Sequence, residues 1–508
     1  MAFLKHPKQL KKAAALIPAI VAVLASAAEA AICAADVGPA LDAIAAQPLL
    51  RTARVGVLVE TQGATPVERQ VVYQRDADRF FIPASNAKLL TTAAALDFLG
   101  PDYRIRTSVL ASAAGGDSET ASGLTSLRVV GRGDPSFSQQ DLASLAQQIT
   151  AAGVRQVSQL VADDSYFAGS AVNPNWEWED VQAGYGAPVN SLILEGNALN
   201  LSLVPQAVGQ PLRVIWEDGA PADSWQVINQ SQTVAPGTPE SVAVGRDLAQ
   251  PVLYVQGQLV AGSDAEEVAI AIPTPAQNFV AQLQRALVAR GVLVGRTAVV
   301  QDAAAGGFAD MTELAFHQSP PLSELLIPTN RNSNNLYAEA LLKTVGVRYF
   351  SQATETPNEA SQNATAAGVI AATAVLTRIG LAPSSFVLAD GSGLSRHNLV
   401  TPSALVEVLQ RMATHPRAAV YRSSLSVAGV SGTLRNRLRG TSLEGNFYGK
   451  SGAVSGNVSL SGYLNAPNYQ PLVVSILINN SNQRAGQLRQ VIDDMLLTLA
   501  QVEDCSDR

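Results

Sequence analysis

The sequence is short of several residue types, and each shortage argues against a class of protein. Its 508 residues include only two cysteines and four histidines, and these form no pair with zinc-site spacing, which disfavours a metal hydrolase. Beyond the first thirty residues, no apolar run is long enough to span a bilayer. With 47% hydrophobic and 15% charged residues, the chain is not disordered and is long enough for two or three domains. We expect neither a metal nor another cofactor.

Lysine is concentrated at the N-terminus, where the pattern is that of a signal peptide. Four lysines precede an apolar run from Ala13 to Ala28, and Ala28-Glu29-Ala30 has the small residues of a cleavage site. The four lysines are Lys5, Lys8, Lys11 and Lys12. The alternative, an uncleaved anchor, is disfavoured because the run is short. We therefore expect residues 1–30 to be a signal peptide, the mature protein to be exported, and no stable membrane anchor.

The chain has no excess of positive charge. Its formal net charge is −7; the first thirty residues carry four Lys and one Glu, a net +3, so the remainder carries −10. An acidic exported protein is a poor candidate for binding nucleic acid or anionic lipid. We expect no nucleic-acid partner.

The two cysteines, Cys33 and Cys505, lie near opposite ends of the expected mature chain. The termini of a domain are often close in space, and an exported protein tolerates disulfides. These features predict a Cys33–Cys505 disulfide, with two free thiols as the alternative.

After residue 30 only Lys88, Lys343 and Lys450 remain, and arginine supplies nearly every other positive charge. We expect Lys343 to be a solvated helix residue. Lys88 follows Ser85 by three positions in a helix that begins near Pro83 and ends at Gly100. Residues three apart share a helix face, and a lysine neutralised by burial can accept a serine proton. Alone, this Ser-x-x-Lys spacing is a weak signal that also arises by chance.

Strand and helix patterns divide the mature chain into three parts. Residues 36–100 and 312–503 mix helices with strands and include the Ser-x-x-Lys pair. Residues 101–195 and 275–311 each contain a helix, a glycine stop and a valine-rich strand, which suggests one small α/β domain built from two segments. Residues 196–274 contain only strand-like runs separated by Pro and Gly, which suggests an inserted β domain.

Two more short motifs follow along the chain. Ser333-x-Asn335 precedes a predicted helix, where Ser and Asn are also ordinary N-cap residues. Lys450-Ser451-Gly452 lies among strand patterns, where a glycine often marks close approach of a ligand. Ser-x-x-Lys, Ser-x-Asn and Lys-[Ser/Thr]-Gly, in this order, are the motifs of penicillin-binding proteins and β-lactamases. More than two hundred residues separate the first motif from the second, too many for a minimal β-lactamase.

The chain resembles the D-alanyl-D-alanine carboxypeptidase/endopeptidase family, the DacB-like class C penicillin-binding proteins of peptidase family S13. The resemblance extends over nearly the whole mature chain, with further matching runs at 131–135, 163–167, 176–180, 390–396 and 431–434. It implies an α/β (α+β) penicillin-binding transpeptidase-like/serine β-lactamase fold, with the two domains inserted after the serine helix. It also implies a periplasmic enzyme that acts on peptidoglycan stem peptides and crosslinks and is trapped by β-lactam antibiotics.

The same resemblance gives roles to five residues. Ser85 would attack the carbonyl of the bond after a D-Ala and form an acyl-enzyme, with Lys88 as the base. Ser333 would relay a proton to the leaving amine, and Asn335 would hold the acyl-side amide of the substrate. Lys450 would supply positive potential near the serine and the substrate carboxylate.

Substrate binding is expected at Ser451, Gly452, Ala453 and Asp180. The backbone N–H groups of Ser85 and Ala453 would form the oxyanion hole. The family's Lys-Thr-Gly-Thr is here Lys-Ser-Gly-Ala, so Ala453 lacks a hydroxyl that in relatives helps to bind the terminal carboxylate. This difference puts in doubt the strength of carboxypeptidase relative to endopeptidase action. Asp180 would help to form an acidic, aromatic pocket for a substrate ammonium, and the alternative is a solvated turn with two packed tryptophans, Trp176 and Trp178.

Three other functions compete with this one. A Ser-His-Asp hydrolase would need His317, His397 or His415, but no Gly-x-Ser-x-Gly elbow is present. A β-lactamase or esterase on the same scaffold stays open, because a fold alone does not set the substrate. A wall-binding protein that has lost turnover is disfavoured by the intact motifs.

Overall fold

The computed structural model describes residues 4–6, 31–112, 125–217, 225–302, 311–352 and 362–505. Apart from Leu4–His6, which form the short strand β1, the predicted signal peptide lies outside the described residues. The helices are α1 (Val37–Ala45), α2 (Ala87–Leu99), α3 (Gln139–Ala151), α4 (Pro275–Val288), α5 (Leu322–Asn330), α6 (Asn335–Gln352), α7 (Ala364–Arg378), α8 (Pro402–Thr414), α9 (Ala418–Ser423) and α10 (Ala485–Ala500). None of the helices among these residues is long and apolar enough to cross a membrane.

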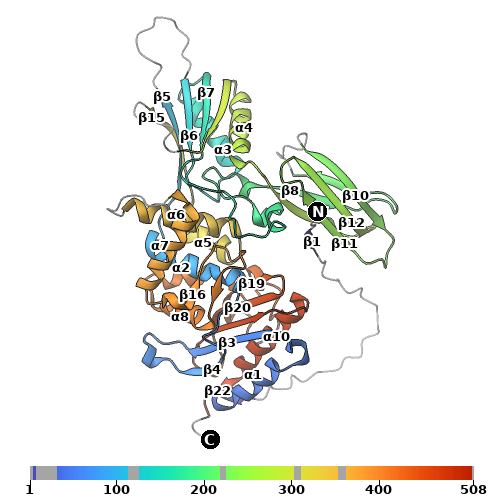
Figure 1. Cartoon of the computed structure of the whole chain (residues 1–508), viewed down its shortest axis with the longest axis vertical. Helices are drawn as coiled ribbons and strands as arrows, with labels where there is room; N and C mark the ends of the chain where they lie inside the picture. Colours follow the sequence, from blue (N-terminus) through green and yellow to red (C-terminus); the bar gives the residue numbers. More distant parts are fainter. Residues whose placement is uncertain are drawn as a thin grey trace, which may run out of the picture.

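A six-stranded antiparallel sheet forms the centre of the lower half of the molecule (Figure 1). Its order is β18 (Ser426–Val427), β19 (Phe447–Val454), β20 (Asn457–Leu464), β21 (Leu472–Asn479), β3 (Arg54–Thr61) and β4 (Val71–Arg75). Successive side chains of a strand point to opposite faces, and here both faces are covered. On β3, Val57 and Val59 pack into the core under α1 and α10, whereas Leu58 packs into the core formed with α2 and α8.

Helix α2 lies inside the second of these cores. Its residues from Ala87 to Leu96 are all buried, because α5, α6, α7 and α8 surround it. A helix that is apolar on every side is stable only when it is covered in this way. Gly100, with a φ of 87°, ends the helix as its sequence predicted.

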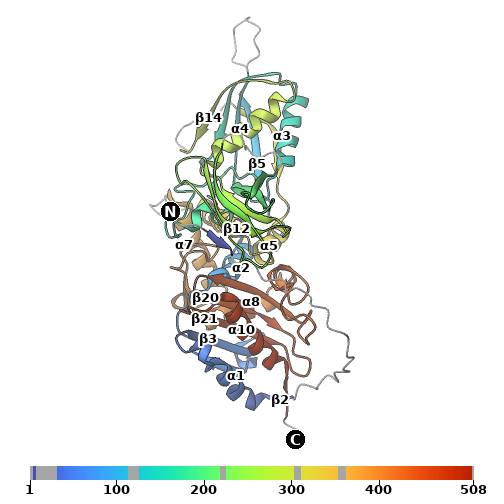
Figure 2. The ribbon, with the colours of Figure 1, turned by 90° about the vertical axis from the view of Figure 1, so that its right-hand side faces the viewer.

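A five-stranded sheet with α3 and α4 forms the top of the molecule (Figures 1 and 2). Its order is β14 (Leu293–Val300), β7 (Gln156–Asp163), β6 (Thr125–Val130), β5 (Arg106–Ser112) and β15 (Met311–Gln318). β14 pairs in parallel with β7, so segments from both sides of residues 196–274 share one sheet. β15 also belongs to this sheet, so the expected boundary at residue 312 falls inside a strand.

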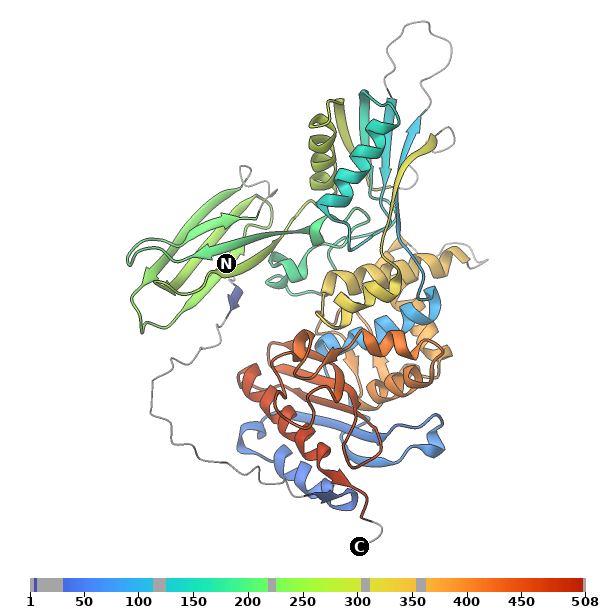
Figure 3. The same cartoon turned by 180° about the vertical axis from the view of Figure 1, so that it is seen from behind.

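Two smaller sheets lie beside this unit, as seen from behind in Figure 3. They share a single apolar core. One has the order β13 (Glu266–Ala271), β8 (Ala198–Val204), β9 (Arg213–Trp216). The other has the order β1, β11 (Ser241–Arg246), β12 (Val252–Val260), β10 (Gln226–Val234). Leu201 of the first sheet and Val244 and Val255 of the second are buried in this core.

The two ends of the described mature chain are joined. β2 (Ile32–Cys33) pairs in parallel with β22 (Val502–Glu503), and Cys33 and Cys505 form a disulfide. The predicted disulfide is therefore confirmed. Another two-stranded unit, β16 (Phe386–Val387) with β17 (Leu399–Val400), is joined to the segment before α2 by the bridge between Phe81 and Val400.

Candidate active site

Ser85 lies in a tight turn at the start of α2. Residues Ala84–Asn86 form a single 3-10 turn, and α2 itself begins at Ala87, slightly later than its sequence predicted. Ala84 has a φ of 47°, a conformation that costs free energy for a residue with a side chain. A Cβ on Gly393 would lie 1.8 Å from the Ala84 carbonyl oxygen, so only glycine lets that loop approach the turn. The turn is thus held in place from outside.

The Lys88 side chain is fully buried beside Ser85. Its Nζ lies 3.0 Å from Ser85 Oγ and donates to Asn335 Oδ1 at 2.7 Å and to the Ser392 carbonyl oxygen at 2.6 Å. Neither of those two oxygens can donate a proton. A neutral amine has two N–H donors and one lone pair, so these acceptors use both donors and leave the lone pair for the Ser85 hydroxyl.

Burial also changes the protonation of this amine. Desolvation lowers the pKa of Lys88 to about 7, and the charges of Asp390 and Glu339 offset only part of the effect. A large share of the molecules therefore has a neutral Lys88 at neutral pH. The structure brings together the hydroxyl and the basic amine that the Ser-x-x-Lys spacing predicted.

Lys450 forms a second buried amine on the other side of Ser85. Its Nζ donates to Ser333 Oγ at 2.8 Å and to the Ser451 carbonyl oxygen at 2.6 Å. Burial lowers the pKa of Lys450 well below its usual value, and the nearby Lys88 cation lowers it further. Ser333 has a φ of 60°, which aims its hydroxyl from a strained turn just before α6. Ser333 and Lys450 therefore meet, a contact that the sequence did not predict.

Asn335 is the first residue of α6 and links two parts of the site. Its Oδ1 accepts from Lys88, and its Nδ2 donates to the Tyr185 carbonyl oxygen at 2.9 Å. Because both the oxygen and the nitrogen of the Asn335 amide are hydrogen-bonded, the side chain holds one orientation. Its oxygen in turn holds the Lys88 amine in position.

The third motif lies on β19, which runs directly along the Ser85 turn. A Cβ on Gly452 would come within 2.7 Å of the Pro83 carbonyl oxygen and 2.9 Å of the Ser85 nitrogen. Glycine is thus required for this close approach. β18 pairs only with Tyr448 and Gly449, so it leaves the rest of that edge of β19 uncovered by a strand.

Thr433 is a member of the site that sequence reasoning did not assign. The Ser451 hydroxyl donates to Thr433 Oγ1 at 2.7 Å, and both residues line a cavity with Ser85. Residues 431–434 form one of the runs that match the family, but the sequence pattern indicated no chemical role for them.

A buried loop around Asp390 holds the Ser392 carbonyl in place. Asp390 accepts from the backbone nitrogens of Gly393 at 2.7 Å and Ser395 at 2.6 Å. Glu339 on α6 accepts from the backbone nitrogens of Gly391 at 2.9 Å and Ser392 at 2.8 Å. Burial and the neighbouring Asp390 carboxylate raise the pKa of Glu339.

The expectation that Lys343 is solvated is wrong. Its side chain is buried at 3% exposure, one turn after Glu339, and its Nζ donates to the Val189 carbonyl oxygen at 2.7 Å and the Ser170 carbonyl oxygen at 3.2 Å. Burial lowers the pKa of Lys343, while Glu339 partly opposes this. The chain thus buries all three of the lysines that follow residue 30.

Asp180 lies in the same cavity as Ser85, but its carboxylate already has partners. The carboxylate accepts from the Tyr185 hydroxyl at 2.9 Å and lies 3.4 Å from Nη1 of Arg396. Nε of the same arginine pairs with Glu177. This cavity of about 290 Å³ is lined by Ser85, Asp180, Tyr185, Ser333, Asn335, Gly393, Leu394, Arg396, Ala453, Val454 and Ser455. Of the two nearby tryptophans, Trp176 is buried and Trp178 is 47% exposed, so the alternative of two packed tryptophans fits only one of them.

Among the described residues that line the two cavities at Ser85 there is no histidine, and His317 and His415 pair with Asp134 and Asp97. A Ser-His-Asp arrangement at Ser85 is therefore not formed. Within the described ranges, no three His, Cys, Asp or Glu side chains cluster as a metal site would require.

Comparisons with known proteins agree with this geometry. The chain is 34% identical over 477 residues to the D-alanyl-D-alanine carboxypeptidase of Actinomadura sp. (strain R39), covering 91% of this chain and 84% of that one. It is 25% identical over 403 residues to the D-alanyl-D-alanine carboxypeptidase DacB of Haemophilus influenzae, covering 78% and 80%.

Its fold matches the crystal structure of penicillin binding protein 4 (dacB) from Haemophilus influenzae with a TM-score of 0.74 at 23% identity, covering 90% of this chain and 98% of that one. The expected penicillin-binding fold is thereby confirmed. The sequence model of the D-Ala-D-Ala carboxypeptidase 3 (S13) family matches residues 37–502. The chain therefore belongs to the D-Ala-D-Ala carboxypeptidase 3 (S13) family.

Proposed function

We propose that this protein is a serine-type D-Ala-D-Ala carboxypeptidase/endopeptidase that cleaves peptidoglycan stem peptides and their crosslinks through an acyl-enzyme on Ser85. One observation carries the proposal: Ser85 Oγ lies 3.0 Å from a buried Lys88 amine whose pKa is about 7. A hydroxyl beside a neutral amine is the arrangement that a serine nucleophile needs when no histidine is present.

Acylation follows from the contacts around that pair. Lys88 Nζ takes the proton of Ser85, and Oγ attacks the carbonyl carbon of the bond after a D-Ala. The negative charge that develops on the carbonyl oxygen is stabilised by the backbone N–H groups of Ser85 and Ala453. The C–N bond then breaks, and the leaving amine receives its proton from Ser333, which hydrogen-bonds Lys450 at 2.8 Å. The proton that Lys88 took from Ser85 is passed on to Ser333, so that Ser333 is a hydroxyl and Lys88 a neutral amine again before deacylation.

Deacylation uses the same base in reverse. Water gives a proton to Lys88 as its oxygen attacks the ester carbon, and the bond to Ser85 Oγ breaks with return of the proton to Oγ. Asn335 holds the amide on the acyl side, and its contact with Tyr185 keeps its amide oriented. We assign the cavity that contains Asp180 to the acyl side, because Asn335 lines it.

The terminal carboxylate of the substrate is assigned to Ser451 and Thr433, whose hydroxyls lie 2.7 Å apart. Lys450 lies on the same strand as Ser451, and an arriving carboxylate would favour its charged form against the effect of burial. Ala453 offers no second hydroxyl on β19, so Thr433 takes over part of that role. We also propose export by the signal peptide at 1–30, a periplasmic location, and the three-part division expected from the sequence, with the boundary expected at residue 312 moved to the end of β15 at Gln318.

A β-lactam should mimic the D-Ala-D-Ala end and acylate Ser85. A crystal structure of the Haemophilus influenzae penicillin binding protein 4, which aligns with this chain at a TM-score of 0.71, holds a β-lactam. That likeness of fold supports the proposal that β-lactam antibiotics are ligands of this protein.

Digestion of purified muropeptides tests the function. The wild-type protein should release D-Ala from monomeric pentapeptides and convert crosslinked dimers to monomers, as followed by liquid chromatography with mass detection. Ser85→Ala should do neither. Hydrolysis of a penicillin without action on either peptide would instead favour the β-lactamase alternative.

A further inference from the structure

A groove of about 870 Å³ runs from Ser85 along β19 to α10, and the functional account above uses only its first part. A groove of this size fits a ligand as large as a short peptide, well beyond a single amino acid. It shares Ser85, Ser333 and Ala453 with the cavity that contains Asp180 and extends in a different direction.

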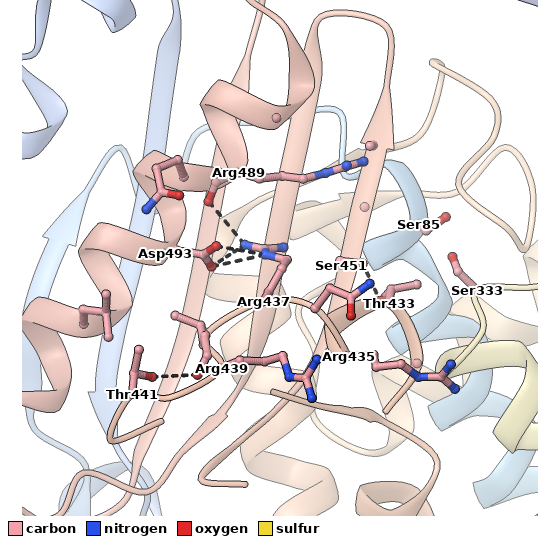
Figure 4. Close-up of a pocket in the computed structure, with 18 residues that line it drawn as sticks. Ser85, Ser333, Thr433, Arg435, Arg437, Arg439, Thr441, Ser451, Arg489 and Asp493 are labelled. Atoms are coloured by element: carbon pink, nitrogen blue, oxygen red, sulfur yellow. Dashed lines mark hydrogen bonds and ion pairs between the residues drawn. The ribbon is translucent and has the colours of Figure 1, made fainter. Parts of the chain in front are cut away.

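Arginine dominates the far part of the groove (Figure 4). Arg435, Arg437 and Arg439 come from the segment after the 3-10 turn Gly432–Leu434, and Arg489 comes from α10. The only acidic lining residue is Asp493. In a chain with a net charge of −7, four guanidinium groups around one carboxylate form a strong local excess of positive charge.

The single carboxylate is already used. Arg437 makes a forked contact with Asp493, with Nη2–Oδ1 at 2.7 Å and Nε–Oδ2 at 3.2 Å, shown by dashed lines in Figure 4. Arg435 and Arg439 are exposed, and no ion pair within the described part of the chain involves either of them. Burial and the neighbouring Arg437 cation lower the pKa of Arg489, so a ligand carboxylate there would relieve a repulsion.

The residues at the two ends of the site indicate which part of the substrate each cavity would bind. Asn335 and Asp180 line the smaller cavity, which we assign to the acyl side. Ser451 and Thr433 line the arginine groove, and we assign them the carboxylate next to the departing amine. The groove therefore continues on the leaving-group side of the cleaved bond.

We propose that the arginine groove, lined by Arg435, Arg437, Arg439 and Arg489, binds a peptide leaving group that carries several carboxylates. This inference rests on the proposed function and deepens it, because such a leaving group is the second stem peptide of a crosslink rather than a free D-Ala. The groove then favours endopeptidase over carboxypeptidase action. Planar guanidinium groups suit carboxylates because they can donate two parallel hydrogen bonds.

Three synthetic substrates test the proposal: a crosslinked peptide dimer, the same dimer with the carboxylates of its leaving strand amidated, and a monomer ending in D-Ala-D-Ala. Amidation should lower kcat/KM of the wild-type protein on the dimer about tenfold, because the charge-assisted hydrogen bonds from the arginines are lost. Arg435→Gln/Arg439→Gln should lose about as much on the free dimer, mainly through KM.

The variant should also become insensitive to amidation, and its dependence on ionic strength should flatten. The matched control is Arg285→Gln/Arg290→Gln, which removes two exposed arginines at the end of α4. The Arg290 side chain donates to the Ala143 carbonyl oxygen at 3.3 Å, away from the groove. The control should keep the wild-type response to amidation.

Equal wild-type kcat/KM on free and amidated dimers would overturn the proposal, as would equal losses by the groove variant on dimer and monomer. Failure of the function itself looks different, because the wild-type protein would then cleave none of the three substrates.

Discussion

The central chemical feature of the protein is the Lys88 amine, in which every hydrogen-bonding position has a partner. Asn335 and Ser392 accept from Lys88, so its remaining position faces Ser85 at 3.0 Å. Because burial lowers the pKa of Lys88 to about 7, the neutral form increases as pH rises through 7. The rate of acylation by a penicillin should fall about tenfold per pH unit below this point and level off above it.

Stopped-flow acylation across pH 5–9 measures this dependence. In Lys88→Met, the fall of the acylation rate below pH 7 should disappear, and acylation should be at least about a hundredfold slower. The same substitution should raise Tm. A folded pKa below the unfolded value means that the lysine destabilises the native state at pH values below its unfolded pKa, most strongly below 7. A fall below pH 7 that persists in Lys88→Met would assign it to another group.

Glu339 acts at the same scale as a positioning residue. Its carboxyl accepts from the backbone nitrogens of Gly391 and Ser392, and the Ser392 carbonyl in turn holds Lys88. Glu339→Ala would leave two buried donors unpaired at about 1–3 kcal/mol each, so Tm should fall and the acylation pH midpoint should shift. Glu339→Gln keeps the accepting oxygen and should restore the midpoint. Identical pH midpoints in wild type and Glu339→Ala would remove Glu339 from this role.

At the scale of the element, β19 matters because its backbone touches the Ser85 turn. Gly452→Ala would place a Cβ 2.4 Å from Ser459 Oγ, the group that itself bonds the Pro83 carbonyl oxygen at 2.6 Å. Overpacking of this kind costs about 1–3 kcal/mol and would push the turn away from the strand. We expect at least a hundredfold slower acylation by penicillin with a small loss of Tm.

Gly38→Ala is the matched control for this substitution. Gly38 lies in α1, and its nearest contact for an added Cβ is a Tyr73 ring carbon at 4.0 Å. Alanine in a helix should raise stability by about 0.5–1 kcal/mol and leave acylation as in wild type. If Gly452→Ala acylates as fast as Gly38→Ala, close approach of β19 is not required.

At the scale of the whole molecule, one covalent link joins residues 472 positions apart. Cys33 and Cys505 link β2, just before α1, to β22, which lies below the central sheet and away from α2 (Figure 1). Cys33→Ser/Cys505→Ser should lose about 2–5 kcal/mol of stability, seen as a lower Tm by calorimetry. Penicillin acylation below the new Tm should stay unchanged. An unaltered Tm would show that β2 and β22 hold without the link.

The sequence predicted the features that depend on residues close together in the chain. It missed several features that depend on residues brought together only by folding. Ser85, Lys88, Ser333, Asn335 and Lys450 lie in three short motifs, and the resemblance to a known family gave them their roles, so all five could be named in advance. Burial of Lys343 could not, because it depends on carbonyl groups at 170 and 189, which only the folded chain brings to α6. The arginine groove was missed for the same reason, since α10 contributes Arg489 from far along the sequence.

Covalent labelling of the intact protein by a penicillin tests the central claim most directly. Mass spectrometry should show one added penicillin on the wild-type protein, mapped by proteolysis to the peptide that contains Ser85, and no added mass on Ser85→Ala. Labelling that survives in Ser85→Ala, or that maps to a different serine, would contradict the account.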